Sequence, residues 1–165
     1  MRNVRSYICL FGLLFLSVCL IAQTQSSGYE IVNRIHLDGD GGWDYLTVDE
    51  DAGLLYVSHG TMVQVVDVKT DKLIATIEDT KGVHGITIAA EFGKGYISCG
   101  RDSTVVVFDI KTFKTLIRVK VNGANPDAIL YDPFSKNVFV FNGRSKNVTV
   151  IDAKTDKIVL SLIHI

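Results

Sequence analysis

Cysteine, proline and tryptophan are scarce in this sequence. Of its 165 residues, three are cysteine, two are proline and one is tryptophan. Cys9 and Cys19 lie in the apolar N-terminal segment, which leaves Cys99 as the single cysteine of the remaining chain. One thiol cannot form an internal disulfide bond or a cysteine metal cluster. The sequence therefore excludes a disulfide-stapled small domain and a cysteine-based zinc fold.

The sequence also lacks an excess of positive charge. It has 17 Lys and Arg against 18 Asp and Glu, a formal net charge of −1. Removing residues 1–22 takes away Arg2 and Arg5 and no acidic residue, so 15 basic residues remain and the net charge becomes −3. A strongly basic nucleic-acid surface is therefore not expected. With 47% hydrophobic and 21% charged residues, the chain still suits a folded domain.

Residues 1–22 have the composition of a secretion signal. Residues 1–5 carry two arginines, residues 7–21 are almost entirely apolar, and Ala22 offers a small residue before a polar run. The apolar stretch is shorter than the roughly 20 residues of a spanning helix, which argues against a membrane anchor. We expect cleavage after Ala22, a periplasmic or secreted location and no membrane span after cleavage. Residues 23–28 would then be a linker.

A lipid anchor at Cys19 is a less favoured alternative to simple cleavage. Residues 16–19, Leu-Ser-Val-Cys, loosely resemble a lipobox. Val18 is larger than the Gly or Ala usual at its position, and two apolar residues follow Cys19.

An internal repeat sets the organisation of the chain. The motif Asp-x-Lys-Thr occurs at residues 67–70, 109–112 and 152–155, at spacings of 42 and 43. A fixed period of this length is typical of propellers and solenoids. Other positions recur in step, because an aromatic residue precedes a glycine by four positions in each block. These pairs are Tyr56 and Gly60, Tyr96 and Gly100, and Phe139 and Gly143.

Within each block, apolar residues alternate over short runs bounded by Gly, Asp, Asn and Lys, which indicates strands. In the third block we predict strands at residues 128–132, 137–142, 147–152 and 157–161. Four short antiparallel strands in each repeat make a propeller blade. We therefore predict an all-β fold, a β-propeller of four-stranded antiparallel blades. The predicted blades are residues 43–80, 84–121 and 126–162.

The strings Y-V-S-H-G at residues 56–60 and Y-I-S-C-G at residues 96–100 resemble the YVTN repeats of YncE-like bacterial β-propellers. The third copy, F-V-F-N-G at residues 139–143, departs from that pattern, and we interpret it as repeat drift. The resemblance implies a closed, commonly seven-bladed ring in an exported, monomeric protein. It also implies binding or scaffolding roles without a common reaction. Binding of single-stranded DNA is ascribed to one relative.

Three blades are too few for a closed ring, which typically has about four to eight. We expect residues 29–37 to be an outer strand that completes the last blade of a full ring. Residues 160–165 read as the translation of CTG TCT CTT ATA CAC ATC, which resembles a transposon-end sequencing adapter. We therefore expect a truncated gene, and a naturally short chain is the alternative.

Loop positions predict which polar residues lie together. In an up-and-down blade the loop before the first strand and the loop between the second and third strands share one face. We interpret the Asp-x-Lys-Thr motifs, on the opposite face, as turns in which Asp and Thr bond nearby backbone groups. The candidate ligand-binding residues on the first face are Trp43, Asp44, His59, His84, Arg101, Asp127 and Arg144.

Arg101 and Arg144 occupy equivalent loops of successive blades. Planar guanidinium groups bind carboxylate or phosphate through paired hydrogen bonds. With Trp43 on the same face, these arginines favour an anionic or aromatic ligand. The alternative is a pair of solvated arginines that bond the adjacent Asp102 or a neighbouring blade.

Histidine and aspartate on this face also suit a transition metal. His59, His84 and Asp44 show no ligand-spacing signature, however, so no metal is predicted. Asp44 and Asp127 begin first strands, and we expect them to cap the turns between blades.

No G-x-S-x-G elbow, Walker loop or H-E-x-x-H motif is present in the sequence. We therefore predict no catalytic residue and no cofactor. The favoured function is an exported binding or scaffold propeller whose loop-rich face takes a small ligand, a polymer or a protein. Two alternatives stay open. One is a propeller lyase or quinoprotein-like oxidoreductase with its site in missing blades, and the other is single-stranded nucleic-acid binding, which the charge disfavours.

Overall fold

The computed structural model describes residues 28–163. The chain divides into two units, Met1–Arg34 and Ile35–Ile165, and every described strand belongs to the second. The predicted signal peptide and His164 lie outside the described residues. Within residues 28–163, no helix is long and apolar enough to cross a membrane.

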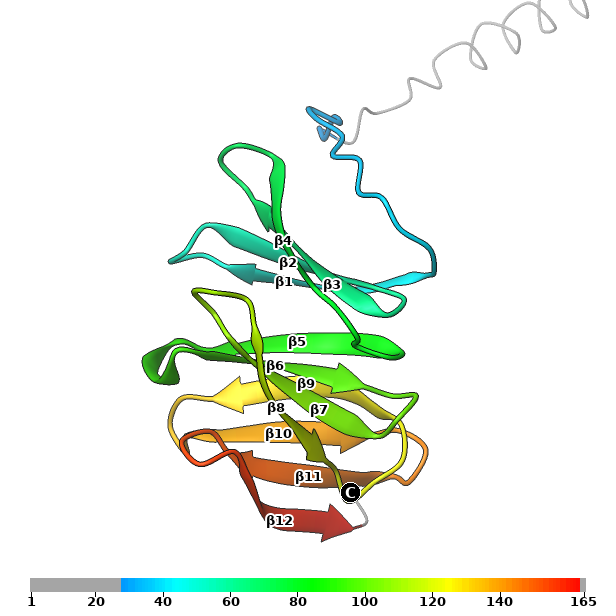
Figure 1. Cartoon of the computed structure of the whole chain (residues 1–165), viewed down its shortest axis with the longest axis vertical. Helices are drawn as coiled ribbons and strands as arrows, with labels where there is room; N and C mark the ends of the chain where they lie inside the picture. The colour runs from blue at the N-terminus through cyan, green and yellow to red at the C-terminus, as the bar shows by residue number, and fades with distance from the viewer. Residues whose placement is uncertain (1–27, 164–165) are drawn as a thin grey trace, which may run out of the picture. The chain divides into compact units, whose positions relative to one another are not determined.

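The second unit consists of three four-stranded antiparallel sheets (Figure 1), here called blades 1, 2 and 3. Strands within each blade pair in chain order. Among the described residues there is one 3₁₀ turn, η1 (Ala90–Phe92), which joins the first and second strands of blade 2. Blade 1 contains β1 (Trp43–Asp49), β2 (Leu54–His59), β3 (Met62–Asp67) and β4 (Lys72–Ile77). Blade 2 contains β5 (Val83–Ala89), β6 (Lys94–Cys99), β7 (Thr104–Asp109) and β8 (Thr115–Lys120). Blade 3 contains β9 (Pro126–Asp132), β10 (Asn137–Asn142), β11 (Asn147–Asp152) and β12 (Lys157–Ile163).

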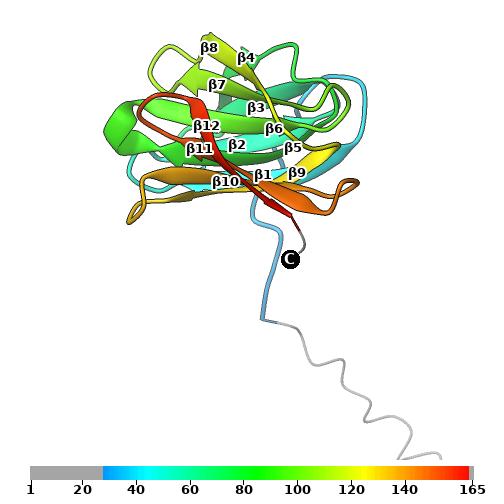
Figure 2. The same ribbon diagram turned by 90° about the horizontal axis from the view of Figure 1, so that it is seen from below.

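The blades are arranged as in a propeller, which confirms the predicted fold class. The first strand of blade 2, β5, contacts the first strands of both neighbours, β1 and β9. Figure 2 shows β4 and β8 together on one side of the sheets and β1 and β9 on the other. The first strands therefore lie where the central channel of a propeller would be, and the fourth strands lie outside.

Apolar side chains on both faces of the strands fill the two interfaces between blades. Val and Ile predominate because a β-branched side chain packs well on a pleated surface. Each such side chain contributes about 1.5–3 kcal/mol when fully buried. The interface of blades 1 and 2 includes Tyr56, Val63, Val65, Ile86, Ile97 and Phe108. The interface of blades 2 and 3 includes Tyr96, Val105, Val107, Val138, Val140 and Ile151.

One glycine of the core is needed for close packing. Gly95 in β6 stands opposite Phe108 in β7, and the Phe108 ring covers it. A Cβ atom at Gly95 would lie 2.2 Å from the Phe108 ring, so no larger residue fits without repacking.

The Asp-x-Lys-Thr motifs form turns between the third and fourth strands, which confirms their structural interpretation. Asp109 Oδ1 accepts hydrogen bonds from the backbone N–H groups of Lys111 (3.0 Å) and Thr112 (2.7 Å). The Thr112 hydroxyl donates a further bond to it at 2.9 Å. Asp67 and Asp152 accept equivalent bonds from Thr70 and Thr155. Lysine side chains at these turns are exposed, which keeps the blade end soluble.

Three strand predictions differ from the structure. The strand predicted at residues 157–161 extends to Ile163 in β12. The first strand of blade 3 begins at Pro126 rather than at residue 128, because Pro126 pairs with Asn142 before an irregularity in the ladder. Residues 29–37 form no strand in the described structure. The described residues include no last blade for them to complete, so the closing strand stays a prediction.

Candidate functional site

Backbone hydrogen bonds place the candidate loops on one face of the blades, here called the loop face. In blade 2, Gly100 N donates to Gly82 O at 2.8 Å, which joins the turn between β6 and β7 to the loop before β5. In blade 3, Gly143 N donates to Asn125 O at 2.9 Å. Blade 1 repeats the arrangement with the backbone bond from Gly60 to Gly42. The predicted sharing of one face is therefore confirmed.

Arg101 and Arg144 occupy equivalent places in this arrangement. Arg101 N donates to Lys81 O and Arg144 N donates to Ala124 O, each at 3.2 Å. Both side chains are exposed, and neither guanidinium has a hydrogen-bond partner among residues 28–163. Asp102, considered as a partner for Arg101, instead accepts a bond from the Thr104 hydroxyl at 2.7 Å. Two exposed guanidinium groups without a hydrogen-bond partner in the described structure thus lie on adjacent blades.

Each first strand carries a β-bulge at its start, and the bulge sets the position of a polar side chain. In blade 1, Trp43 pairs with His59 and Leu46 pairs with Val57, so two residues of β1 oppose one of β2. Blades 2 and 3 have the same irregularity. Bulges redirect side chains and are common beside functional sites. The first bulged residues, at equivalent places in the three blades, are Asp44, His84 and Asp127.

Asp44 and His84 form a polar pair between blades 1 and 2. His84 Nδ1 lies 2.5 Å from Asp44 Oδ2, and the two side chains are 26% and 41% exposed, respectively. A carboxylate only accepts hydrogen bonds, so it holds the proton on Nδ1 and leaves Nε2 to face other groups. Asp44 therefore orients the imidazole instead of capping the turn between blades, which corrects the expectation for that residue.

The other ring nitrogen of His84 points into a space that a glycine leaves open. A Cβ atom at Gly100 would lie 2.8 Å from His84 Nε2 and 2.7 Å from Asn125 Oδ1. Asn125 has a left-handed φ of 59°, which asparagine tolerates better than most residues. Sequence reasoning missed Asn125, although an asparagine directly before Pro126 is a turn signal.

Asp127 lies at the third bulge without joining the Asp44–His84 pair. Its backbone oxygen accepts a hydrogen bond from the Ser98 hydroxyl of blade 2. No group of three or more His, Cys, Asp or Glu side chains within the described residues is placed to hold a metal ion.

Trp43 and His59 have different exposures, although they are in contact. Their rings stack with centroids 3.7 Å apart and an interplanar angle of 16°. His59 is buried, and its Nδ1 lies 3.1 Å from Gln64 Oε1. Trp43 is 54% exposed. His59 thus packs against one face of the Trp43 ring, and of these two residues only the tryptophan has surface accessible to a ligand.

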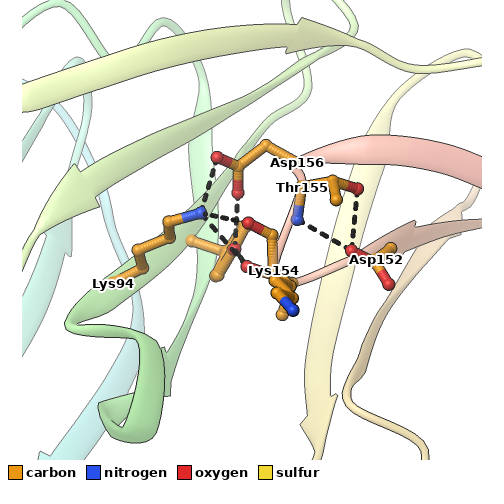
Figure 3. Close-up of polar contacts among 7 residues, drawn as sticks. Lys94, Asp152, Lys154, Thr155 and Asp156 are labelled. Carbon is orange, nitrogen blue, oxygen red and sulfur yellow. Dashed lines mark hydrogen bonds and ion pairs between the residues drawn. The ribbon is translucent and has the colours of Figure 1, made fainter.

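A second polar cluster lies at the opposite ends of blades 2 and 3 (Figure 3). Lys94 Nζ lies 2.7 Å from Asp156 Oδ2 and donates to the backbone oxygens of Ala153 and Lys154 at 3.2 Å. The Tyr96 hydroxyl lies 2.7 Å from Asp156 Oδ1. Burial, together with the Asp156 carboxylate, raises the pKa of Tyr96 far above its usual range. Both Lys94 and Asp156 side chains are 16% exposed, so the cluster clamps two blades together.

Comparison with protein-family models gives no match. The chain is 27% identical over 133 residues to the U3 small nucleolar RNA-associated protein 18 homolog of Arabidopsis thaliana, covering 70% of this chain and 24% of that protein. It is similar in structure to Kuenenia stuttgartiensis hydrazine synthase, with a TM-score of 0.68 and 24% identity over 81% of this chain and 39% of the other. That neighbour has a propeller-type fold, and likeness at this identity concerns the fold alone. The sheets and this neighbour together identify the chain as a β-propeller protein.

Proposed function

We propose that this chain belongs to an exported β-propeller of the YVTN-repeat, YncE-like type and that its loop face binds an anionic ligand or partner. The signal-like residues 1–22 support export. The Y-V-S-H-G and Y-I-S-C-G strings support the family, because both fall on second strands that lead into the loop face. A binding or scaffold role suits a fold that holds many loops on one rigid face.

The equivalent placement of Arg101 and Arg144 carries this proposal. Backbone bonds fix both loops, while the two guanidinium groups stay exposed and uncommitted. A carboxylate or phosphate accepts paired bonds from such groups. The imidazole of His84, oriented by Asp44, adds a further polar group at the same face. The ligand class favoured by this set is a polycarboxylate or a phosphate-bearing molecule.

Titration of the mature chain, residues 23–165, with citrate and with inorganic phosphate tests this function. The double variant Arg101→Ala, Arg144→Ala should weaken binding by more than about a hundredfold, because each arginine loses at least one charged hydrogen bond worth about 1.5–3 kcal/mol. The matched control is Lys69→Ala, Lys111→Ala, which removes the same charge from the Asp-x-Lys-Thr turns. The control should bind normally. Equal affinities for the double variant and the original chain contradict the proposal.

Single-stranded nucleic acid is a second candidate ligand, favoured by the exposed ring of Trp43 on its His59 support. Stacking of a base on an aromatic ring, beside positive charge that binds the backbone, contributes about 1–3 kcal/mol per base to the binding free energy. The curated protein named above is RNA-associated by its name, at 27% identity. Trp43 is the single tryptophan, so oligothymidylate that stacks on it should quench the intrinsic fluorescence. Unchanged fluorescence rejects this candidate and leaves the small-anion proposal in place.

An enzymatic role rests on the Asp44–His84 pair. A histidine oriented by a carboxylate can accept a proton through Nε2. The structural neighbour is an enzyme by its name, and its identity to this chain is 24%. A gene that encodes further blades would test this alternative, because those blades would have to supply an acid, base or metal set facing His84.

A further inference from the structure

Two hydrogen-bond acceptors lie close together on the loop face, where blade 3 borders blade 2. A Cβ atom at Gly100 would lie 2.8 Å from His84 Nε2 and 2.7 Å from Asn125 Oδ1, so both atoms lie over the same point of the backbone. Asp44 holds the imidazole proton on Nδ1, and Nε2 of a neutral ring then only accepts. Neither atom has a hydrogen-bond partner among residues 28–163. Both atoms are therefore available to a donor from a ligand.

Asp127 extends this set of acceptors toward the next glycine of the loop face. A Cβ atom at Gly143 would lie 3.7 Å from Asn125 Nδ2 and 4.0 Å from Asp127 Oδ2, so the Asn125 side chain lies between His84 and Asp127. The Asp127 carboxylate has no hydrogen bond or ion pair within the described residues, because only its backbone oxygen is bonded. All three residues are partly exposed. We call the side chains of His84, Asn125 and Asp127 the acceptor row.

Positive charge lies beside the acceptor row without neutralising it. Arg101 and Arg144 directly follow Gly100 and Gly143, the two glycines that the row borders. Both arginines are exposed, and among the described residues neither guanidinium pairs with Asp127 or with another carboxylate. Unpaired cations and unpaired acceptors thus lie side by side. Such a surface complements a ligand that carries an anionic group next to a hydrogen-bond donor.

The donor that suits the row best is a cation rather than a hydroxyl. Asp127 carries a negative charge and Asp44 places another behind His84, so the row attracts positive charge. An ammonium group has several N–H donors for several acceptors, whereas a hydroxyl has one O–H. A metal ion suits the row less well, because no group of three or more His, Cys, Asp or Glu side chains in the described part of the chain could hold one. The row is therefore complementary to an ammonium group.

We propose that the loop face recognises an amino-carboxylate. Its carboxylate binds Arg101 and Arg144, and its neighbouring ammonium group binds the acceptor row. This inference rests on the anion-binding function proposed above, and it adds the requirement for a cationic donor beside the anion. An amino-dicarboxylate meets both requirements, because it offers one carboxylate to each arginine and its ammonium group to the row. The row lies over the interfaces of blade 2 with blades 1 and 3, so it does not depend on an outer blade face.

Succinate, malate and aspartate test the inference, because these dicarboxylates differ only in bearing a hydrogen, a hydroxyl or an ammonium group on one carbon. Calorimetric titration of the mature chain at about pH 8, where histidine is ordinarily neutral, gives the three affinities. Attraction to the arginines alone ranks aspartate last, since its ammonium group lowers its net negative charge. We expect the reverse order. Aspartate should bind about tenfold to a hundredfold more tightly than succinate, because its ammonium group adds a charged hydrogen bond to the row.

Variants at Asn125 test whether the row holds the ammonium group. Asn125 has a left-handed φ of 59°, which glycine adopts without strain, so Asn125→Gly removes an acceptor and keeps the turn. This variant should lower the preference for aspartate over succinate about tenfold. Asn125→Asp should raise the preference, because it adds a negative charge at the same place. The matched control is Asp71→Gly, at a left-handed residue (φ 57°) beside the Asp-x-Lys-Thr turn of the opposite face, and it should keep the preference of the original chain.

The outcomes separate this inference from the function on which it rests. Succinate that binds through Arg101 and Arg144, together with aspartate that binds equally or less tightly, overturns the inference and keeps the anion-binding function. Malate that binds more tightly than aspartate also overturns it, because the row then takes a hydroxyl. Absence of binding for all three ligands overturns both proposals. A preference for aspartate that neither Asn125→Gly nor Asn125→Asp changes, in variants with the circular dichroism of the original chain, places the ammonium group elsewhere and overturns the inference.

Discussion

The hydroxyl of Tyr96 lies 2.7 Å from the carboxylate of Asp156, across the interface of blades 2 and 3. The equivalent tyrosine of blade 1, Tyr56, is fully buried, and its hydroxyl has no hydrogen-bond partner among residues 28–163. The difference follows from one turn position, because blade 2 has Phe113 where blade 3 has Asp156, both with left-handed φ. Desolvation raises the pKa of Tyr56 to about 12, with a smaller contribution from Asp49.

Removing the same oxygen atom from the two tyrosines should have opposite effects. Tyr96→Phe should lower the free energy of unfolding by about 1–3 kcal/mol, because it breaks a buried charged contact. Tyr56→Phe should leave stability unchanged or raise it, because a buried hydroxyl without a partner carries a desolvation cost. Urea denaturation of both variants measures the difference, and equal losses would refute the assignment of the Tyr96 clamp.

Acid should destabilise the blades through the Asp-x-Lys-Thr turns. The pKa values of Asp67, Asp109 and Asp152 lie below the ordinary 3.8. The main cause in each turn is hydrogen bonding from the threonine that follows the aspartate by three residues. Because the native pKa is the lower one, the stabilisation is present above pH 3.8 and is lost as the pH falls through the native value. Asp109→Asn should flatten the fall of the unfolding free energy over this range. Glu50→Gln is the control, because it removes the same charge from an exposed side chain that has no hydrogen-bond partner in the described structure. This control should leave the pH dependence of the unfolding free energy unchanged.

A methyl group at Gly100 should disturb the Asp44–His84 pair. Its Cβ would lie within 2.8 Å of His84 Nε2, so Gly100→Ala should cost about 1–3 kcal/mol of stability. The double variant Gly100→Ala, His84→Ala should recover part of that loss, since one of the two crowded atoms, His84 Nε2, is gone while Asn125 Oδ1 remains. Gly42→Ala is the control, because nothing lies within 4 Å of a Cβ there. Strict additivity of the two single losses would argue against the described contact.

Cys99 should be unreactive in the native chain. Its thiol is buried, and burial raises its pKa to about 12, so the reactive thiolate is scarce near neutral pH. A thiol reagent should label the mature chain slowly until denaturant is added and then label one site per chain. Rapid native labelling would mean that the interface of blades 1 and 2, where Cys99 lies, opens readily.

Export should remove residues 1–22. Intact mass spectrometry of secreted or periplasmic material should give a chain that begins at Gln23. Retention of Met1–Ala22, or a lipid mass on Cys19, would contradict cleavage after Ala22.

The sequence by itself determined the blade as a unit. Three signals in the sequence are short-range: the alternation of apolar residues, the glycine after each second strand and the Asp-x-Lys-Thr turns. Each determines the conformation of residues only a few positions away in the sequence. They therefore predicted the strands, the turns and the shared loop face of Arg101 and Arg144. The tertiary structure alone decided which side chains meet across blades. His84 reaches Asp44 over 40 residues of sequence, and a bulge, which depends on strand pairing, turns it there.

Burial was likewise decided only by packing. His59 and His84 were equal candidates in the sequence, yet stacking under Trp43 buries the first and leaves the second part exposed. From the sequence, Phe139 was interpreted as repeat drift, because comparing the repeats considers each position separately. Strand pairing places Leu130 beside it on the same face, so the two residues form one apolar surface.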